Sequence, residues 1–232
     1  MLNYLLSGST DITTLLLVAL SSLFIIFVAL PIHECAHAFT ANRLGDPTGR
    51  HMGRLTINPM AHIDWLGAGL LLLFGFGWAK PVPVNGRNFR YPKRDMAITA
   101  AAGPVTNLLV SAVLFLCANA IFYLVPLSQF TFDVYLFFAT AGQINLFLAV
   151  FNLLPVPPLD GYRILGALLP NRLYYKFMQY EQYFYYILLA LMLIGVAGRV
   201  VSAIEAPVSG WLINLTALPF KLVTGRSSGW IS

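Results

Sequence analysis

Residues 12–37, ITTLLLVALSSLFIIFVALPIHECAH, decide the fold of this 232-residue chain. The first 19 residues of this stretch, 12–30, are apolar except for Thr and Ser. As an α-helix they extend about 29 Å, which is enough to cross the hydrocarbon core of a bilayer. His33, Glu34 and His37 follow directly. Ionisable residues are costly at membrane depth and usually functional, so the chemistry is expected at the end of this helix.

The composition excludes an ordinary soluble domain. Hydrophobic residues make up 58% of the chain, charged residues 10%, and the mean hydropathy is +0.74. Soluble domains contain about 25% charged residues. Two cysteines are too few for a disulfide scaffold. The net charge of +5 comes from basic residues scattered between apolar runs, which is typical of membrane-protein loops and does not indicate nucleic acid.

Further apolar runs predict the rest of the bundle. Residues 97–125 and 134–154 are long enough to span, residues 183–198 predict a fourth span, and residues 207–223 a weaker fifth. The sequence therefore predicts an all-α integral membrane protein of about four to six transmembrane helices. We expect a single domain over 1–232, with the catalytic core at about 12–170 and C-terminal helices at about 183–223.

A region rich in Gly, Pro, Arg and Asn separates the first two predicted spans. Alternation at residues 54–57 predicts a short strand or hairpin. Residues 65–79 are apolar but too short and glycine-rich for a full span, so they predict a re-entrant or interfacial piece. A strand near 54–57 or 80–85 could pair with an extended substrate backbone. A purely structural hairpin explains the same pattern equally well.

The loop charges predict the orientation. Residues 43–94 contain eight Lys or Arg, whereas the residues before 12 and those between 126 and 133 contain none. By the positive-inside rule, residues 43–94 and 161–182 are cytoplasmic and the N-terminus is outside. We expect a multi-pass protein of the cell membrane.

Residues 33–37 form an H-E-x-x-H sequence. Residues four apart lie on one face of a helix, so His33 and His37 can both reach one zinc ion, with Glu34 as general base beside them. The simpler interpretation is a pair of interfacial histidines with Glu34 offsetting local charge, but it leaves Asp160 unexplained. Cys35 is expected to contribute to packing, because a fourth protein ligand would close the site against substrate.

A third ligand is expected from Asp160. It follows a predicted span directly after Pro155, Pro157 and Pro158, which prevent a continuous helix. In the predicted topology, the helix before His33 and the helix before Asp160 both run inward. The three side chains therefore share one depth at the cytoplasmic side, although the two segments are distant in sequence.

At these residues the chain resembles the site-2 protease family of intramembrane zinc metalloproteases. The resemblance rests on the H-E-x-x-H at 33–37 and the N-x-x-P-x-P-x-L-D-G stretch at 152–161, and covers about residues 12–170. Compact members of that family carry stretches similar to GWAKPVPVN at 77–85 and AGPVTN at 102–107. No room is left for the PDZ or CBS domains of some relatives.

The resemblance implies an activity and roles for single residues. One Zn²⁺ per chain would be bound by His33, His37 and Asp160, with Glu34 as general base and Asn152 holding the substrate carbonyl or its oxyanion. Residues 77–85 would lie beside the path of the substrate, a transmembrane protein in the lipid bilayer. The oligomeric state is left open.

Two other functions remain compatible with the sequence. One is a transporter or metal channel that uses the His and Asp cluster as a transit site. The other is an inactive, protease-like membrane scaffold. The clustering of ionisable residues at one depth argues against the first, and the intact Glu34 against the second.

Two contacts between helices are also expected. Gly103 should pack closely on the first span, and Asn107 should form a hydrogen bond between helices.

Overall fold

The computed structural model describes residues 12–74, 77–170, 172–173 and 179–225. Within these ranges the regular elements are helical, as predicted. In chain order they are α2 (Ile12–Phe24), the π-helix η1 (Ile25–Ala29), α3 (Leu30–Arg43), α4 (Thr48–His51), the 3₁₀-helix η2 (Pro59–Ala61), α5 (Trp65–Phe74), the 3₁₀-helix η3 (Gly86–Asn88), α6 (Pro92–Leu124), α7 (Gln129–Asn152), α8 (Asp160–Leu168), α10 (Glu181–Leu193) and α11 (Val196–Thr224).

Four helices are long and apolar enough to cross a membrane, which confirms an integral membrane bundle. They are Ile12–Arg43, Pro92–Leu124, Gln129–Asn152 and Val196–Thr224. The fourth differs from the prediction. Residues 183–198 give a short apolar helix, α10, while the doubtful stretch 207–223 is part of the 29-residue α11. Pro207 and Pro219 are accommodated inside α11, as prolines are in membrane helices.

The first span continues into the H-E-x-x-H segment without a break. α2, η1 and α3 form one helix of 32 residues. The backbone N–H of Leu30 bonds to Ile25 O, one residue further back than in an α-helix. Pro31 follows and contributes no N–H to the ladder. The ligand helix therefore carries its π turn directly before the predicted metal ligands, a place where such turns are often functional.

The expected β-hairpin is not seen in the described part of the chain. Residues 54–57 form no strand, and residues 77–85 have no regular secondary structure. The polar groups near 54–57 are bonded differently: His62 Nε2 lies 2.8 Å from Thr56 O, and the Arg54 guanidinium donates to Ala61 O. Pro59 then starts η2. These contacts replace a strand ladder, and the side-chain alternation alone did not reveal them.

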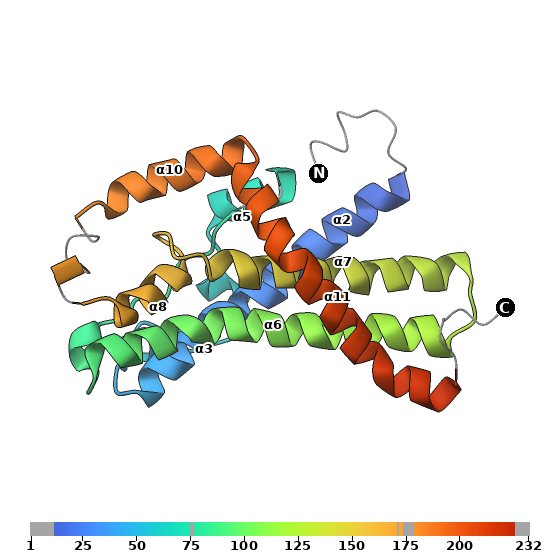
Figure 1. Cartoon of the computed structure of the whole chain (residues 1–232), viewed down its shortest axis with the longest axis horizontal. Coiled ribbons are helices and arrows are strands. Elements are labelled where there is room, and N and C mark those ends of the chain that lie inside the picture. The colour runs from blue at the N-terminus through green and yellow to red at the C-terminus, as the bar shows by residue number, and fades with distance from the viewer. Residues whose placement is uncertain (1–11, 75–76, 171, 174–178, 226–232) are drawn as a thin grey trace.

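Helices α6 and α7 form the centre of the bundle and run antiparallel, and α11 crosses them (Figure 1). Ser111 Oγ of α6 donates to Gly142 O of α7 at 2.8 Å, which fixes their register. Phe115, Leu146 and Leu212 bring the three helices together in one core cluster. In a membrane, apolar helix surfaces gain little by contacting one another instead of lipid. Hydrogen bonds between helices, such as the one between Ser111 and Gly142, therefore help to fix their arrangement.

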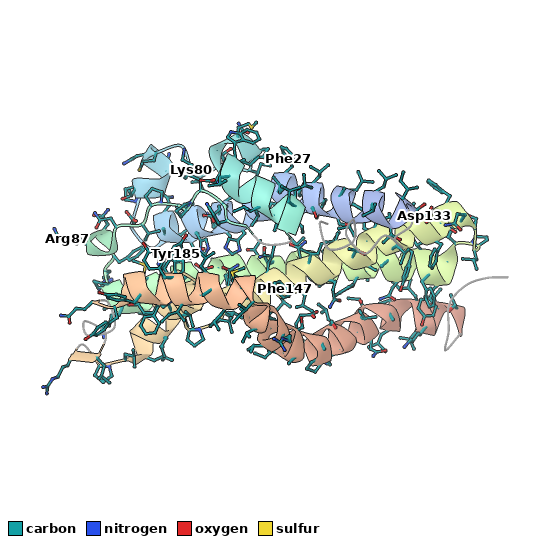
Figure 2. The ribbon with its side chains drawn as sticks, turned by 90° about the horizontal axis from the view of Figure 1, so that it is seen from above. Phe27, Lys80, Arg87, Asp133, Phe147 and Tyr185 are labelled. Carbon is teal, nitrogen blue, oxygen red and sulfur yellow. The ribbon has the colours of Figure 1, made fainter. Side chains whose placement is uncertain are left out.

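The loops between the spans gather at the two ends of the bundle. Figure 2 shows Arg87 at one end and Asp133 at the other. At the Arg87 end, the C-terminal half of α3 lies beside the start of α6, and α8 packs on α6 (Figure 1). The chain thus brings the 33–37 segment and Asp160 to the same end, in agreement with the predicted topology.

Candidate metal centre

Three side chains converge at the end of α3. His33 Nε2 lies 3.4 Å and His37 Nε2 3.3 Å from Asp160 Oδ2, and the two Nε2 atoms lie 3.0 Å apart. The two histidines are buried and Asp160 is nearly so. Within the described residues, this is the group of His, Cys, Asp and Glu side chains whose geometry can hold a metal ion.

The donor set fits zinc. Ligands placed tetrahedrally at bond lengths of about 2.0–2.1 Å lie about 3.3 Å from one another, close to the spacings seen here. His37 Nδ1 lies 2.8 Å from Thr99 O, so this nitrogen carries the proton and Nε2 carries the lone pair. No hydrogen bond of good geometry reaches the buried Asp160 Oδ2. Three electron-rich atoms directed at one point are stabilised by a cation and leave a fourth position open, as in catalytic zinc sites.

Helix α3 and Gly103 together set the position of the rings. His33 and His37 are one turn apart, so both face α6. A Cβ on Gly103 would lie 2.3 Å from His37 Nε2 and 2.5 Å from His33 Cε1. The expectation that Gly103 allows close helix packing is therefore confirmed. The packing is close enough that α6 contacts the rings of His33 and His37 directly.

Asp160 reaches the site because α7 stops at Asn152 and α8 starts at Asp160. The segment between them folds tightly onto α8, since a Cβ on Gly161 would lie 2.2 Å from Leu153 O. Asp160 Oδ2 is directed at the Nε2 atoms of both histidines, and a carboxyl group binds a metal in its ionised form.

Glu34 lies beside the ligands and contacts the segment after α5. Its Oε2 accepts a hydrogen bond from the backbone N–H of Val82 at 3.0 Å. One end of the segment 77–85 is fixed by Lys80 N, which donates to His62 O at 2.7 Å. The other end is fixed by Asn85 N, which donates to Asp46 Oδ2 at 2.7 Å. Residues 77–85 are thus held beside the site.

Asp46 is fully buried and organises the turn after α3. Its Oδ1 accepts from Thr48 Oγ1 at 2.5 Å and from Asn88 Nδ2 at 2.7 Å. Burial raises the pKa of Asp46, and the hydrogen bonds from Thr48, Asn88 and Asn85 lower it by more, so the net pKa is lowered. This carboxylate joins the end of the ligand helix to the segment that carries Val82.

A cavity of about 360 Å³ opens onto the three ligands. Glu34 and Asn152 both line it. Asn152 Nδ2 donates to Leu148 O at 2.9 Å within α7, which leaves its second amide N–H for another acceptor. Residues of the 77–85 segment form one wall, namely Gly77, Trp78, Ala79, Pro81, Val82 and Val84.

The sequence did not point to part of the cavity lining. Arg163, one helical turn after Asp160, lines the cavity, and this i, i+3 spacing was the available signal. Helix α10 adds Tyr185, Leu188, Leu189 and Met192. Apolar residues on such a helix look identical in sequence whether they face lipid or a cavity. Cys35, which was expected to contribute to packing, does not belong to the group of possible metal ligands.

Comparison with known proteins identifies the family. The chain is 42% identical over 168 residues to the protein named "Putative zinc metalloprotease YwhC" of Bacillus subtilis, covering 72% of this chain and 77% of that protein. The profile of Peptidase family M50 matches residues 124–195, which include Asn152 and Asp160. The chain belongs to peptidase family M50. This confirms the resemblance to the site-2 protease family.

Other proteins are similar to the chain over shorter stretches. Rip2 of Mycolicibacterium smegmatis is 36% identical over 149 residues, and MJ0611 of Methanocaldococcus jannaschii is 33% identical over 106 residues. The chain spans about half of these two relatives, 54% and 49% of their lengths. Both are named as putative zinc metalloproteases, and these names indicate zinc as the cofactor. No solved structure gives a significant match.

Proposed function

We propose that the chain is a zinc-dependent endopeptidase that hydrolyses peptide bonds in or near the transmembrane helices of other membrane proteins. The observation that carries the proposal is the convergence of His33, His37 and Asp160 in a cavity at the end of an apolar bundle. Membership of the M50 family supports the same chemistry. Residues 1–232 act as a single transmembrane domain in this proposal.

The ligands supply a Lewis acid and the neighbouring side chains supply proton transfer. Zinc held by His33, His37 and Asp160 would lower the pKa of a bound water from 15.7 to about 7 and polarise the scissile carbonyl. Glu34 accepts the proton of the attacking water and delivers it to the leaving amine. One of its oxygens is anchored by Val82 N, so the other is free to carry this proton in a fixed orientation.

Asn152 stabilises the developing oxyanion in this proposal. Its side chain lines the cavity, and its free amide N–H can donate to the carbonyl oxygen as charge builds there. Loss of a single donor of this type has cost about 2.7–4 kcal/mol of transition-state stabilisation in a well-studied protease. The hydrogen bond to Leu148 O restrains the amide and limits the rotation that binding must overcome.

The substrate enters as extended backbone, because the hydrogen bonds of an intact helix shield the scissile bond. The segment 77–85 has no regular secondary structure and forms a wall of the cavity, so its backbone can lie alongside that of the substrate. Trp78 and Pro81 on this wall and Leu188 on α10 make the lining largely apolar, which suits side chains drawn from a membrane helix.

The site faces the cytoplasm of a multi-pass cell-membrane protein in this proposal. Arg87 and Lys80 of the basic loop lie toward the end of the bundle that holds His33, His37 and Asp160, whereas Asp133 lies at the opposite end (Figure 2). The positive-inside rule assigns the basic end to the cytoplasm.

The proposal is tested with the Glu34→Gln variant in reconstituted membranes containing a membrane-helix substrate. We expect it to keep zinc and to lose cleavage, because an amide cannot accept the proton. Asp133→Asn makes the same chemical change at the far end of the bundle and should cleave like the wild type. Wild-type protein that binds zinc, never cleaves and conducts metal ions would replace this proposal with the transporter function.

A further inference from the structure

One ring nitrogen of His33 and His37 has no hydrogen-bond partner within the described part of the chain. His37 Nδ1 bonds to Thr99 O, and both Nε2 atoms point at Asp160, but His33 Nδ1 is buried without a hydrogen bond. Imidazoles that bind metals almost always donate their second N–H to a carboxylate, a backbone carbonyl or water. His33 therefore needs an acceptor that the protein groups around it do not provide directly.

Asn107 lies one turn beyond the ligands on the same face of α6. It follows Gly103 by four residues, and Gly103 contacts the rings of His33 and His37. Four residues correspond to about 6 Å along a helix. Asn107 is fully buried, and among the residues that the structure describes neither its Oδ1 nor its Nδ2 has a hydrogen-bond partner. An unsatisfied buried amide is costly and calls for an explanation.

Asn145 of α7 lies at the same level. The Ser111–Gly142 hydrogen bond fixes the antiparallel register, so moving four residues back along α6 corresponds to moving about four residues forward along α7. That step leads from Ser111 to Asn107 on one helix and from Gly142 to the neighbourhood of Asn145 on the other. Asn145 is fully buried, its Nδ2 bonds to Ala141 O, and its Oδ1 has no partner.

We propose that Asn107 and Asn145 hold a buried water that accepts the N–H of His33 Nδ1. The unsatisfied groups are two donors, His33 Nδ1–H and Asn107 Nδ2–H, and two acceptors, Asn107 Oδ1 and Asn145 Oδ1. Water offers two donors and two acceptors and matches this set. A cation does not, because it would face N–H groups. The inference rests on the proposed metal centre.

In this arrangement Asn107 is a positioning residue for the metal centre. The water holds the proton of His33 on Nδ1 and keeps the Nε2 lone pair directed at the metal. Thr99 O does the same for His37 through a direct contact. The two histidines would thus be oriented by different groups, His37 by Thr99 O and His33 by the water that Asn107 and Asn145 hold.

The test compares zinc binding by the full chain with Asn107→Leu or Asn119→Leu. Asn119 is a second buried asparagine of α6, but it bonds to Thr216 Oγ1 of α11, far from the ligands. Asn107→Leu should weaken zinc binding by about 10- to 100-fold, measured by competition with a chelator, and should alter the absorption spectrum of the Co²⁺-loaded protein. Asn119→Leu should lower the melting temperature and leave both metal readouts unchanged.

Three outcomes separate the possibilities. Wild-type affinity and spectrum in Asn107→Leu would overturn the inference and leave the metal centre standing. Failure of the wild type to bind zinc would overturn the metal centre and this inference with it. If Asn107→Leu does not fold, a high-resolution structure of the zinc-loaded wild type decides. A water bonded to His33 Nδ1 and Asn107 supports the inference, and a protein group bonded to that nitrogen overturns it.

Discussion

Glu34 Oε2 accepts a hydrogen bond from the backbone N–H of Val82, at 3.0 Å and across 48 positions of sequence. This contact joins the proposed general base to the wall of the cavity. Lys80 and Asn85 anchor the same segment on both sides of Val82. The orientation of the base therefore depends on a loop, and a change in that loop is expected to affect cleavage without touching a ligand.

Val82→Pro removes the N–H that Glu34 accepts. We expect cleavage to fall by about tenfold or more, since general base catalysis contributes about 10²–10⁴ and depends on a well-placed base. Zinc content should stay at the wild-type level. Val82→Ala, which trims the buried side chain and keeps the N–H, is the matched control. Equal activities of the two variants would show that the hydrogen bond is irrelevant to catalysis.

Gly103→Ala tests the contact between α6 and the ligands. The new Cβ would lie 2.3 Å from His37 Nε2, so a ring must move and zinc binding should be largely lost, as measured by metal analysis of the purified protein. Gly210→Ala on α11 meets nothing within 4 Å and should bind zinc normally. Full zinc occupancy in Gly103→Ala would contradict the geometry described here.

Asp46 predicts an acid-dependent loss of stability. Its pKa is lowered in the folded protein, so the unfolded chain binds the proton more readily. The carboxylate therefore stabilises the fold above the ordinary carboxyl pKa of about 3.9, and this contribution disappears as the pH falls through the lower folded-state pKa. Asp46→Asn should lower the unfolding free energy near neutral pH by about 2 kcal/mol.

The measurement for Asp46 is the melting temperature of wild type and Asp46→Asn across the acid range. The difference between the two should be largest near neutrality and should shrink below about pH 4. A difference that stays constant with pH would show that the charge of Asp46 contributes nothing to stability.

Glu205 and Gln143 connect α11 to α7 inside the bundle. Gln143 Nε2 donates to Glu205 Oε1, and Glu205 is buried. Gln143→Leu should destabilise the protein by about 1–3 kcal/mol, because it leaves a buried carboxyl without its donor. Adding Glu205→Leu should recover part of that loss, and Glu205→Gln, which keeps an acceptor, should cost less than Glu205→Leu. Strictly additive effects in this double-mutant cycle would refute the interaction.

The sequence was sufficient to predict the helix that carries His33 and His37 and the approach of Asp160 to it. The apolar run before His33 is long enough to settle the span, and the proline-rich stretch before Asp160 marks the end of another helix. Combined with loop charges, these features placed His33, His37 and Asp160 at one depth, and the structure brings them within 3.4 Å.

Other parts of the fold could not be derived from the sequence. The π turn at Ile25–Ala29 leaves no signature in an apolar run. The strand predicted at 54–57 failed because Arg54 and His62 bond to backbone carbonyls that a ladder would have used. Hydropathy also favoured residues 183–198 over 207–223, whereas the span-length helix is α11, which contains Pro207 and Pro219.

The most direct test of the central claim is X-ray absorption at the zinc edge of the purified, zinc-loaded protein. Binding by His33, His37 and Asp160 predicts one zinc per chain with only nitrogen and oxygen neighbours at about 2.0–2.2 Å. The Asp160→Ala variant should either lose the metal or give a spectrum in which the carboxylate oxygen is no longer a neighbour of zinc. A zinc–sulfur distance of about 2.3 Å, which would identify Cys35 as a ligand, or zinc retained unchanged in Asp160→Ala, would contradict the proposed centre.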